Sequence, residues 1–374
     1  MAFTTIDDPS AHFHTQLYTG SSSGQSITND ANAGDFKPDW VWIKRRDGNP
    51  NVVGNGHNSL YDSSRGVTKE IYSDLNSAEN TNSGSLTAFG TDGFTVGTEA
   101  RVNSNGLAFV TWQWKANGGS ATATGSESGS NPAYSVQANT TAGFSIVTYT
   151  GTGSNGTVPH GLGVKPDWYI IKNRDNTNAD DGRWMVWHKS LEALHNYYSF
   201  IFLHLTNSRS EGTTVVNATP NTTTFALGDD GMVNNDGEKY VAYCFADKQG
   251  YSKSGSYTAN GNGDGPFIYT GFKPAWVMVK ASSASNSETN WVIWDNKRNG
   301  YNPNVQIFAN KNFTEGRRDD NGGDAIADLD ILSNGFKHRN STWGQNGSNG
   351  YVYIYMAFAE HPFVSSKGVP VTAR

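Results

Sequence analysis

The stretch VKPDWYIIK at residues 164–172 decides the fold, because the chain contains the same phrase twice more. We call it the KP phrase; it reads FKPDWVWIK at residues 36–44 and FKPAWVMVK at residues 272–280. Proline has no N–H to give to a sheet, so it belongs at the start of a strand, and the tryptophan two residues later is then the first large inward side chain. We interpret the three phrases as core segments of three copies of one fold. The alternative is a repeated groove in which tryptophan faces stack on sugars.

Each KP phrase lies between a shared opening and a shared close. The apolar residues after the tryptophan indicate a strand that is covered on both faces. The openings read LYTG from residue 17 and TYTG from residue 148, and the third copy offers two candidates, FIYTG from residue 267 and SYTANGNGDG from residue 256. The copies close on the aromatic strands LAFVTWQWK, KYVAYCFAD and VYIYMAFAE.

Two further features recur between the phrase and the close. The second and third copies share WMVWH at residues 184–188 and WVIWD at residues 291–295, and SLYDSSRG from residue 59 is the nearest match in the first copy. Turns then follow as TDGFTVG, DDGMVN and SNGFKHR. Asp-Gly or Asn-Gly between apolar residues predicts a β-hairpin, because both turn positions need positive φ. Helix is expected only in TKEIYSDL from residue 68 and LEALHNY from residue 191.

These patterns predict an all-β protein of three tandem β-sandwich-like repeats. The expected repeats are residues 1–116, 143–250 and 251–374, and residues 117–142 form a Gly/Ser/Thr-rich linker. About 110 residues is a normal size for a sandwich of about seven strands. Three copies in one chain can be arranged with pseudo-three-fold symmetry, by analogy with closed oligomers.

The composition excludes several classes of function. Aromatic residues make up 12% of the chain and charged residues 17%, and a disordered chain would not carry so much apolar surface. The net charge of −6 argues against nucleic acid as a partner, because phosphate binding needs clustered Lys and Arg. The first residues show no secretory signal, and no apolar run reaches the roughly 20 residues of a membrane span. We therefore expect a soluble protein made inside a cell.

Two catalytic or nucleotide-binding motifs occur only by accident of composition. GTGSNG at residues 151–156 fits the dinucleotide fingerprint, but the following TVPHGLGVKP cannot begin the helix that receives a pyrophosphate. GSSSG at residues 20–24 fits a nucleophile elbow, but it lies in a polar loop with no helix after it. The one cysteine, Cys244, is expected to be a buried structural thiol.

No catalytic, cofactor-binding or metal-binding residue is predicted. His188 and His204 lie among apolar residues and are expected to be core or edge histidines. Asp324, Asp328 and Asp330, and the neighbouring RRDDNGGD, resemble no calcium loop of the D-x-D-x-D-G type and are expected to be solvated acidic turns. The sequence offers four candidate carboxylates for glycoside hydrolysis, and no pattern distinguishes them from surface charges. They are Asp175, Asp180, Asp181 and Glu192.

A resemblance extends over nearly the whole chain. TAGFSIVTYTGTGSNGTVPHGLGVKPDWYIIKNRD, YVAYCFADKQGYSKSGSYTANGNGDGPFIYTGFKPAWVMVK and the two chain ends resemble a family of tailed-bacteriophage proteins from marine and cyanobacterial phages. The resemblance implies a virion structural protein without cofactors, assembled in the host cytoplasm. It favours a tail fibre or adhesin component that contacts other virion proteins and a host glycan. The alternatives are a capsid decoration protein on the head and, less favoured, a glycan-degrading enzyme.

Overall fold

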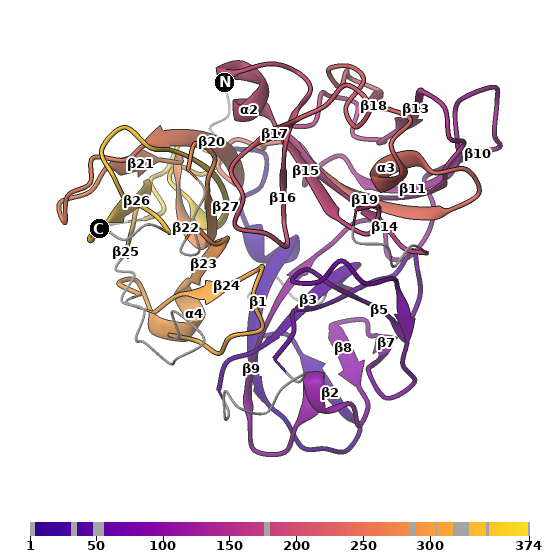
Figure 1. The fold of residues 1–374 in the computed structure, drawn as a ribbon. Helices are drawn as coiled ribbons and strands as arrows, with labels where there is room; N and C mark the ends of the chain where they lie inside the picture. The colour runs from indigo at the N-terminus through magenta and orange to yellow at the C-terminus, as the bar shows by residue number, and fades with distance from the viewer. Residues whose placement is uncertain are drawn as a thin grey trace.

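The computed structural model describes residues 4–30, 36–47, 56–175, 180–284, 289–303, 305–316, 329–341 and 344–372. Its regular structure is almost entirely antiparallel β-sheet, which confirms the all-β class. The sheets form three lobes around a common centre (Figure 1). Lobe 1 runs from η1 to β9, lobe 2 from β10 to β19, and lobe 3 from β20 to β27.

Lobe 1 pairs a large sheet with a small one. The large sheet has the order β1 (Phe13–Thr19), β9 (Ala108–Trp114), β3 (Trp40–Arg45), β4 (Ser59–Asp62), β5 (Lys69–Tyr72) and β6 (Asn80–Thr81). The small sheet has the order β2 (Gln25–Thr28), β8 (Gly93–Val96) and β7 (Leu86–Phe89). The short helices are η1 (Pro9–Ala11) and α1 (Ala100–Asn103).

Lobe 2 has the same two parts with two additional edge strands. Its large sheet has the order β10 (Ala123–Gly125), β11 (Ala133–Asn139), β12 (Phe144–Thr150), β19 (Lys239–Phe245), β14 (Trp168–Asn173), β15 (Trp184–His188), β16 (Ser199–Phe202) and β17 (Ser210–Glu211). Its small sheet pairs β13 (Gly156–Pro159) with β18 (Thr224–Leu227). The helices are α2 (Lys189–Leu194) and α3 (Gly231–Asn234).

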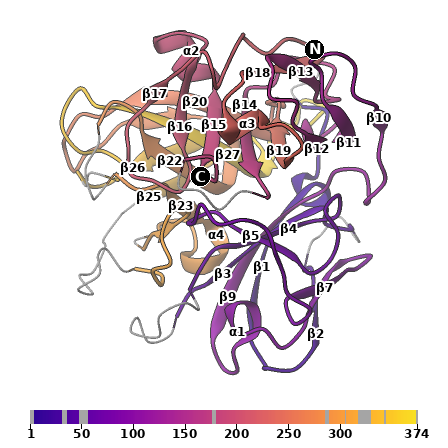
Figure 2. The same ribbon diagram turned by 45° about the vertical axis from the view of Figure 1, so that its right-hand side comes forward.

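Lobe 3 again combines a large and a small sheet. The large sheet has the order β20 (Ser252–Thr258), β27 (Val352–Pro362), β22 (Phe272–Ala281), β23 (Val292–Asp295) and β24 (Ile307–Phe308). The small sheet has the order β21 (Phe267–Tyr269), β26 (Gly335–His338) and β25 (Leu329–Leu332). The helix α4 (Asn296–Asn299) follows β23. Figure 2 shows lobe 3 and lobe 2 lying above lobe 1 in the turned view.

The three large sheets share one strand order. The orders β1-β9-β3-β4-β5, β12-β19-β14-β15-β16 and β20-β27-β22-β23-β24 each place the closing strand beside the strand of the KP phrase. Register relates the lobes residue by residue, because the tryptophan of the phrase always faces the same place on the closing strand. The pairs are Trp40 with Trp114, Trp168 with Phe245, and Trp276 with Phe358. We call residues at matching register places equivalent.

Each large sheet is buried on both faces, as expected from its sequence. In β3, Trp40 and Trp42 belong to a core shared by all three lobes, whereas Val41 and Ile43 pack inside lobe 1 against its small sheet. Strands β14 and β22 alternate in the same way between the shared core and their own lobe. The repeated tryptophans are therefore core residues, at most 2% exposed, and not a sugar-stacking groove.

Three equivalent aromatic residues lie at the centre of the shared core. The ring centroids of Trp114 and Phe245 are 6.5 Å apart, those of Phe245 and Phe358 are 5.9 Å apart, and those of Trp114 and Phe358 are 5.6 Å apart. Each ring comes from the closing strand of a different lobe. The lobes therefore bury their largest apolar side chains against one another, and burial of apolar area is the main favourable term in folding.

The structure corrects three expectations from the sequence. Residues 117–142 are not only a linker, because β10 and β11 extend the large sheet of lobe 2. TKEIYSDL does not form a helix: its residues form β5, which pairs with β4. The Asp-Gly of DDGMVN does not close a hairpin, because Asp230 caps α3 through Met232 N–H instead.

Other expectations are confirmed. The SLYDSSRG segment supplies β4 in the place of β15 and β23. SYT at residues 256–258 belongs to β20, the equivalent of β1 and β12, whereas FIY forms β21 of the small sheet. The turns of TDGFTVG and SNGFKHR close the β7–β8 and β25–β26 hairpins. LEALHNY overlaps α2.

Candidate functional site

The boundaries between lobes, which we call seams, are tied by equivalent hydrogen bonds. Trp184 is the first residue of β15, and Asn58 and Trp291 come directly before β4 and β23, so the three occupy the same register place. Each donates to a main-chain oxygen at an equivalent place in the next lobe. The bonds run from Asn58 Nδ2 to Phe308 O (3.0 Å), from Trp184 Nε1 to Tyr72 O (2.8 Å), and from Trp291 Nε1 to Phe202 O (2.8 Å). Lobe 1 donates to lobe 3, lobe 3 to lobe 2 and lobe 2 to lobe 1, so the seams close a ring.

A second set of equivalent residues lies at the other end of these strands. Asp62 and Asp295 accept hydrogen bonds from Tyr243 OH (2.7 Å) and Trp112 Nε1 (3.2 Å) of neighbouring lobes. Each of these buried carboxylates also pairs with an arginine three residues later, Arg65 or Arg298. A buried charge needs such partners, because removing one of them leaves the other uncompensated. These pairs therefore fix the seams as well as the ends of β4 and β23.

Lobe 2 has a histidine where the other lobes have an aspartate. His188 is fully buried, and burial lowers the pKa of its imidazole to about 3, so the ring is neutral at pH 7. Its Nδ1 accepts from Ser190 N–H at 3.1 Å, which caps α2, and Nε2 lies 3.2 Å from Tyr355 O of lobe 3. A neutral ring that accepts at Nδ1 must carry its proton on Nε2. His188 is therefore the donor of its seam, and both of its ring nitrogens have partners within the chain.

Three equivalent lysines are buried where the strands of the KP phrases end. Lys44, Lys172 and Lys280 have no exposed surface, and desolvation lowers the pKa of each ammonium to about 7. Within the described residues, their hydrogen bonds go to main-chain oxygens. Each reaches one oxygen of a neighbouring lobe: Lys311 O for Lys44 (2.8 Å), Asn76 O for Lys172 (3.4 Å) and Thr206 O for Lys280 (3.2 Å). Such a low pKa would suit a nucleophilic amine, but no described pocket reaches these side chains. They act as donors across the seams.

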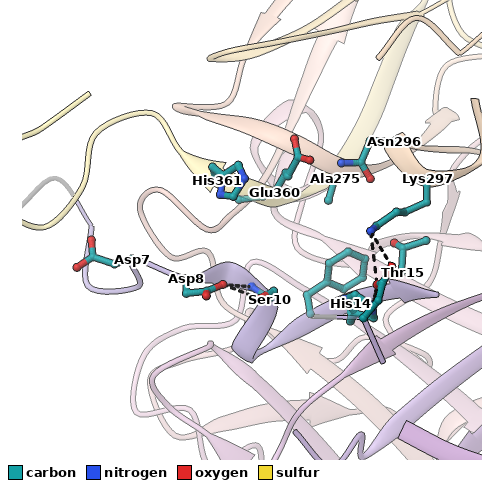
Figure 3. A pocket seen from close by; sticks show the side chains of 13 residues that line it. Asp7, Asp8, Ser10, His14, Thr15, Ala275, Asn296, Lys297, Glu360 and His361 are labelled. Carbon is teal, nitrogen blue, oxygen red and sulfur yellow. Dashed lines mark hydrogen bonds and ion pairs between the residues drawn. The ribbon is translucent and has the colours of Figure 1, made fainter. Parts of the chain in front are cut away.

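A groove of about 160 Å³ lies at the seam between lobes 1 and 3. Figure 3 shows His14 and Lys297 at one end of it and Asp7, Asp8 and His361 at the other. Asp30 joins the first two, at 2.7 Å from His14 Nε2 and 3.3 Å from Lys297 Nζ. Burial lowers the pKa of His14, although Gln16 and Asp30 oppose that shift.

The groove coincides with the place where the third KP phrase has alanine instead of aspartate. In lobes 1 and 2 the aspartate of the phrase accepts a main-chain N–H near the end of the closing strand: Asp39 from Ala116 at 2.7 Å, and Asp167 from Asp247 at 2.6 Å. Lobe 3 has Ala275 at this place, and Ala275 and Glu360 line the groove (Figure 3). The small side chain of Ala275 therefore lines the groove where the other two lobes have a hydrogen-bonded carboxylate.

The side chains of the groove are engaged in structural contacts. Asp8 caps η1 through Ser10 N–H at 2.9 Å, and Asp7 accepts from Ser366 N–H at 2.7 Å. Glu360 accepts from Tyr301 OH at 3.0 Å and lies 3.1 Å from Lys273 Nζ. Serine, histidine and carboxylate are present. Ser10 Oγ donates to Asp8 Oδ1 at 2.6 Å, and the same carboxylate oxygen accepts from Ser10 N–H, so this contact belongs to the cap of η1. The groove offers charge and hydrogen-bond contacts.

Neither accidental motif lies in the structural context that its chemistry needs. GTGSNG leads into β13 and not into a helix, so no anion site forms. GSSSG connects β1 to β2, and Ser22 Oγ accepts from Asn105 N–H at 2.9 Å. Ser22 does have a positive φ of 55°. Its partners, however, are main-chain groups of residues 103 and 105, and no imidazole activates it.

The remaining predicted residues take structural positions. Cys244 is buried, as expected, and burial raises the pKa of its thiol. His204 is half-buried, and burial lowers its pKa to about 3. Asp330 accepts from Asn302 and pairs with Arg339. Asp324, Asp328 and all of RRDDNGGD lie outside the described residues.

Three of the four candidate carboxylates have a main-chain donor or a basic partner. Asp175 accepts from Lys239 N–H at 2.8 Å, Asp180 pairs with Arg183, and Glu192 pairs with Lys165. Burial and the charges of Asp230, Glu238 and Asp180 raise the pKa of Asp181. No group of three or more His, Cys, Asp or Glu in the described part of the chain is placed to hold a metal ion. Nor is any described helix both long and apolar enough to cross a membrane.

Sequence reasoning missed the seam residues. The three lysines are the last letters of the KP phrases, but a lysine is usually exposed, and nothing local predicts its burial. Asn58 and Trp184 share a role without sharing chemistry, because both a side-chain amide and an indole can donate an N–H. Only the strand register reveals that they are equivalent.

The comparisons with known proteins give one match. A sequence model of a protein family described as a domain of unknown function (DUF7483) matches residues 8–362. The comparisons with curated proteins and with solved structures gave no match.

Proposed function

The chain belongs to the DUF7483 family, and we propose that it is a non-enzymatic structural protein of a tailed-bacteriophage virion. The observation that carries the proposal is the ring of equivalent seam bonds from Asn58, Trp184 and Trp291. In this chain the buried polar groups join lobe to lobe, which is what a rigid building block needs. The resemblance noted in the sequence supplies the phage context.

The ring also suggests how such a block would be placed. Three lobes with one strand order, whose central rings are Trp114, Phe245 and Phe358, form a pseudo-three-fold body within a single chain. A body of this kind presents three related surfaces around one axis. It therefore fits a position of local three-fold symmetry in a larger assembly.

Our first placement is at the tail, as a fibre or adhesin component that contacts other virion proteins and a host glycan. This placement follows from the family resemblance. A second candidate, a decoration protein on the capsid head, is favoured by ring closure within one chain, since such a chain occupies a three-fold position without forming a trimer. A glycan-degrading enzyme is the least favoured alternative, because Asp175, Asp180 and Glu192 already accept a main-chain hydrogen bond or pair with a basic side chain.

Labelling of intact virions tests the proposal. Gold-conjugated antibody against this chain is applied to purified particles and located by electron microscopy. Gold on the tail supports the first placement, and gold over the whole head supports the decoration protein. Absence of the chain from purified virions, checked by mass spectrometry, contradicts both structural placements and favours the enzyme alternative.

A further inference from the structure

The outer faces of the three small sheets differ in one respect. Ile27, Val158 and Ile268 are equivalent inward residues, opposite Phe94, Phe225 and Phe336 in the partner strands. The residues on either side of them point outward, because successive side chains of a strand alternate between its faces. These outward pairs are Ser26 and Thr28 in lobe 1, Thr157 and Pro159 in lobe 2, and Phe267 and Tyr269 in lobe 3.

The aromatic pair of lobe 3 is exposed to solvent. Phe267 is 45% exposed and Tyr269 is 53% exposed. Lobes 1 and 2 build the same sheet with small or half-buried residues at these places, so the fold does not require aromatic side chains there. Exposed aromatic residues that packing does not need mark a surface that contacts something else.

A cavity adjoins Tyr269. Its volume is about 310 Å³, and it is lined by residues from three segments of the chain. Its polar side chains include Asp247, Gln249, Ser252 and Lys253. Lys253 Nζ donates to Tyr269 O at 3.0 Å and lies 5.2 Å from the centroid of the tyrosine ring. The cavity therefore combines an exposed aromatic ring with an amine, an amide, a hydroxyl and a carboxylate.

The apolar rim of the cavity comes from the C-terminal segment. Phe363 and Val364 line the cavity, and Val371 N–H bonds to Phe363 O at 3.1 Å. Val369 and Val371 are 58% and 44% exposed. One side of the cavity is therefore apolar and the other polar. That division matches a pyranose ring, which has a C–H face and an equator of hydroxyl groups.

We propose that the outer face of β21, with Phe267, Tyr269 and the adjoining cavity, binds a saccharide. A sugar ring lies on the face of Tyr269, and its hydroxyl groups reach Lys253 and Gln249. Sites for small ligands are concave and carry a few placed polar groups, as this cavity does, whereas a protein partner would cover about 800 Å² of the surface. The inference rests on the proposed function, for which it names the residues of a host-glycan contact.

The test is binding of the full chain to an array of immobilised oligosaccharides of hexoses, hexosamines and uronic acids. The variant Phe267→Ser with Tyr269→Thr gives lobe 3 the residues that lobe 1 has at these places. The control is Tyr197→Ala, which removes an exposed tyrosine of lobe 2. We expect the wild type to bind at least one sugar class, the double variant to bind it at least tenfold more weakly, and the control to bind it unchanged. Equal melting temperatures check that both variants fold.

Three outcomes overturn the inference. The first is that the wild type binds none of the three sugar classes at millimolar concentration, and the second is that the double variant binds as well as the wild type. The third is that the double variant keeps its sugar binding but is lost from virions, which would make the face a protein contact. Virion labelling reports the proposed function separately, so a chain that is absent from particles but binds sugar refutes only that function.

Discussion

The indole Nε1 of Trp184 donates a hydrogen bond of 2.8 Å to the main-chain oxygen of Tyr72, 112 residues earlier in the chain. A second oxygen, that of Leu75, lies 3.0 Å from the same nitrogen. The bond joins lobe 2 to lobe 1, and Trp291 makes the equivalent bond from lobe 3 to lobe 2. Trp276, by contrast, has an indole nitrogen without a hydrogen-bond partner among the described residues.

This contrast predicts how two tryptophan substitutions differ. Trp184→Phe removes a donor from two buried carbonyl groups, and leaving such groups unpaired costs about 1–3 kcal/mol. Trp276→Phe loses similar packing but no hydrogen bond, so it is the matched control. We expect the free energy of unfolding, measured with urea, to fall by about 1–3 kcal/mol more in Trp184→Phe than in the control. Equal losses would mean that the seam bond contributes nothing.

The buried lysines predict a rise of stability with pH. Each of Lys172 and Lys280 has a pKa of about 7 in the folded chain, against 10.5 for the free side chain. Between these values the unfolded chain binds more protons, so the free energy of unfolding rises with pH by up to about 1.4 kcal/mol per pH unit for each lysine. At about pH 10 the unfolded tyrosines ionise and oppose this rise, since burial raises the pKa of several folded ones, such as Tyr240.

The variant Lys172→Met with Lys280→Met isolates this effect. Urea midpoints at pH 7, 8 and 9 give the slope of stability against pH, and the comparison uses the slope because the absolute stability also changes. We expect a shallower slope in the double variant than in the wild type. Parallel slopes would show that these ammonium groups keep an ordinary pKa in the folded protein.

The low pKa of His188 predicts a loss of stability at acid pH. Its pKa falls from 6.5 to about 3 on folding, so the unfolded chain binds more protons as the pH drops below 6.5. The contribution of the neutral ring to stability is therefore lost progressively between about pH 6.5 and pH 3. His188→Asn keeps a side chain that can cap α2 and removes the titration. We expect its stability, followed by circular dichroism from pH 7 to pH 4, to fall less steeply than that of the wild type; an equal or steeper fall would count against this role.

Closure of the ring within one chain predicts the state in solution. The seams use the donors of all three lobes internally, so a second copy is not needed to complete them. Light scattering should give a mass near 40.5 kDa, that of one chain. A stable trimer at three times this mass would favour a fibre and weaken the decoration alternative.

Much of the architecture could be predicted from the sequence. The KP phrases located β3, β14 and β22, because proline and tryptophan mark the start of a strand and its first buried side chain. Alternation predicted that these strands are buried on both faces. Strand pairing overrode local propensity at residues 69–72. These residues have the polar and apolar mixture of a helix, but they form β5, which pairs with β4.

The seams could not be predicted in the same way. Residues 117–142 are small and polar, and such composition indicates a linker, yet β11 completes an edge of the sheet through main-chain bonds that need no particular side chain. The place of Asn58, Trp184 and Trp291 is filled by different residue types, so no sequence pattern marks it. The sequence around Phe267 and Tyr269 indicated only a candidate repeat opening. The exposure of these two side chains could not be predicted, because it depends on the neighbouring strands.

The claim that the three lobes form one body around a shared core is tested most directly by differential scanning calorimetry of the intact chain. Because Trp114, Phe245 and Phe358 pack against one another from three lobes, no lobe can unfold without exposing the core of the other two. The account predicts a single transition whose calorimetric enthalpy equals its van't Hoff enthalpy. Two or three resolved transitions, each with the enthalpy of one lobe, would contradict it.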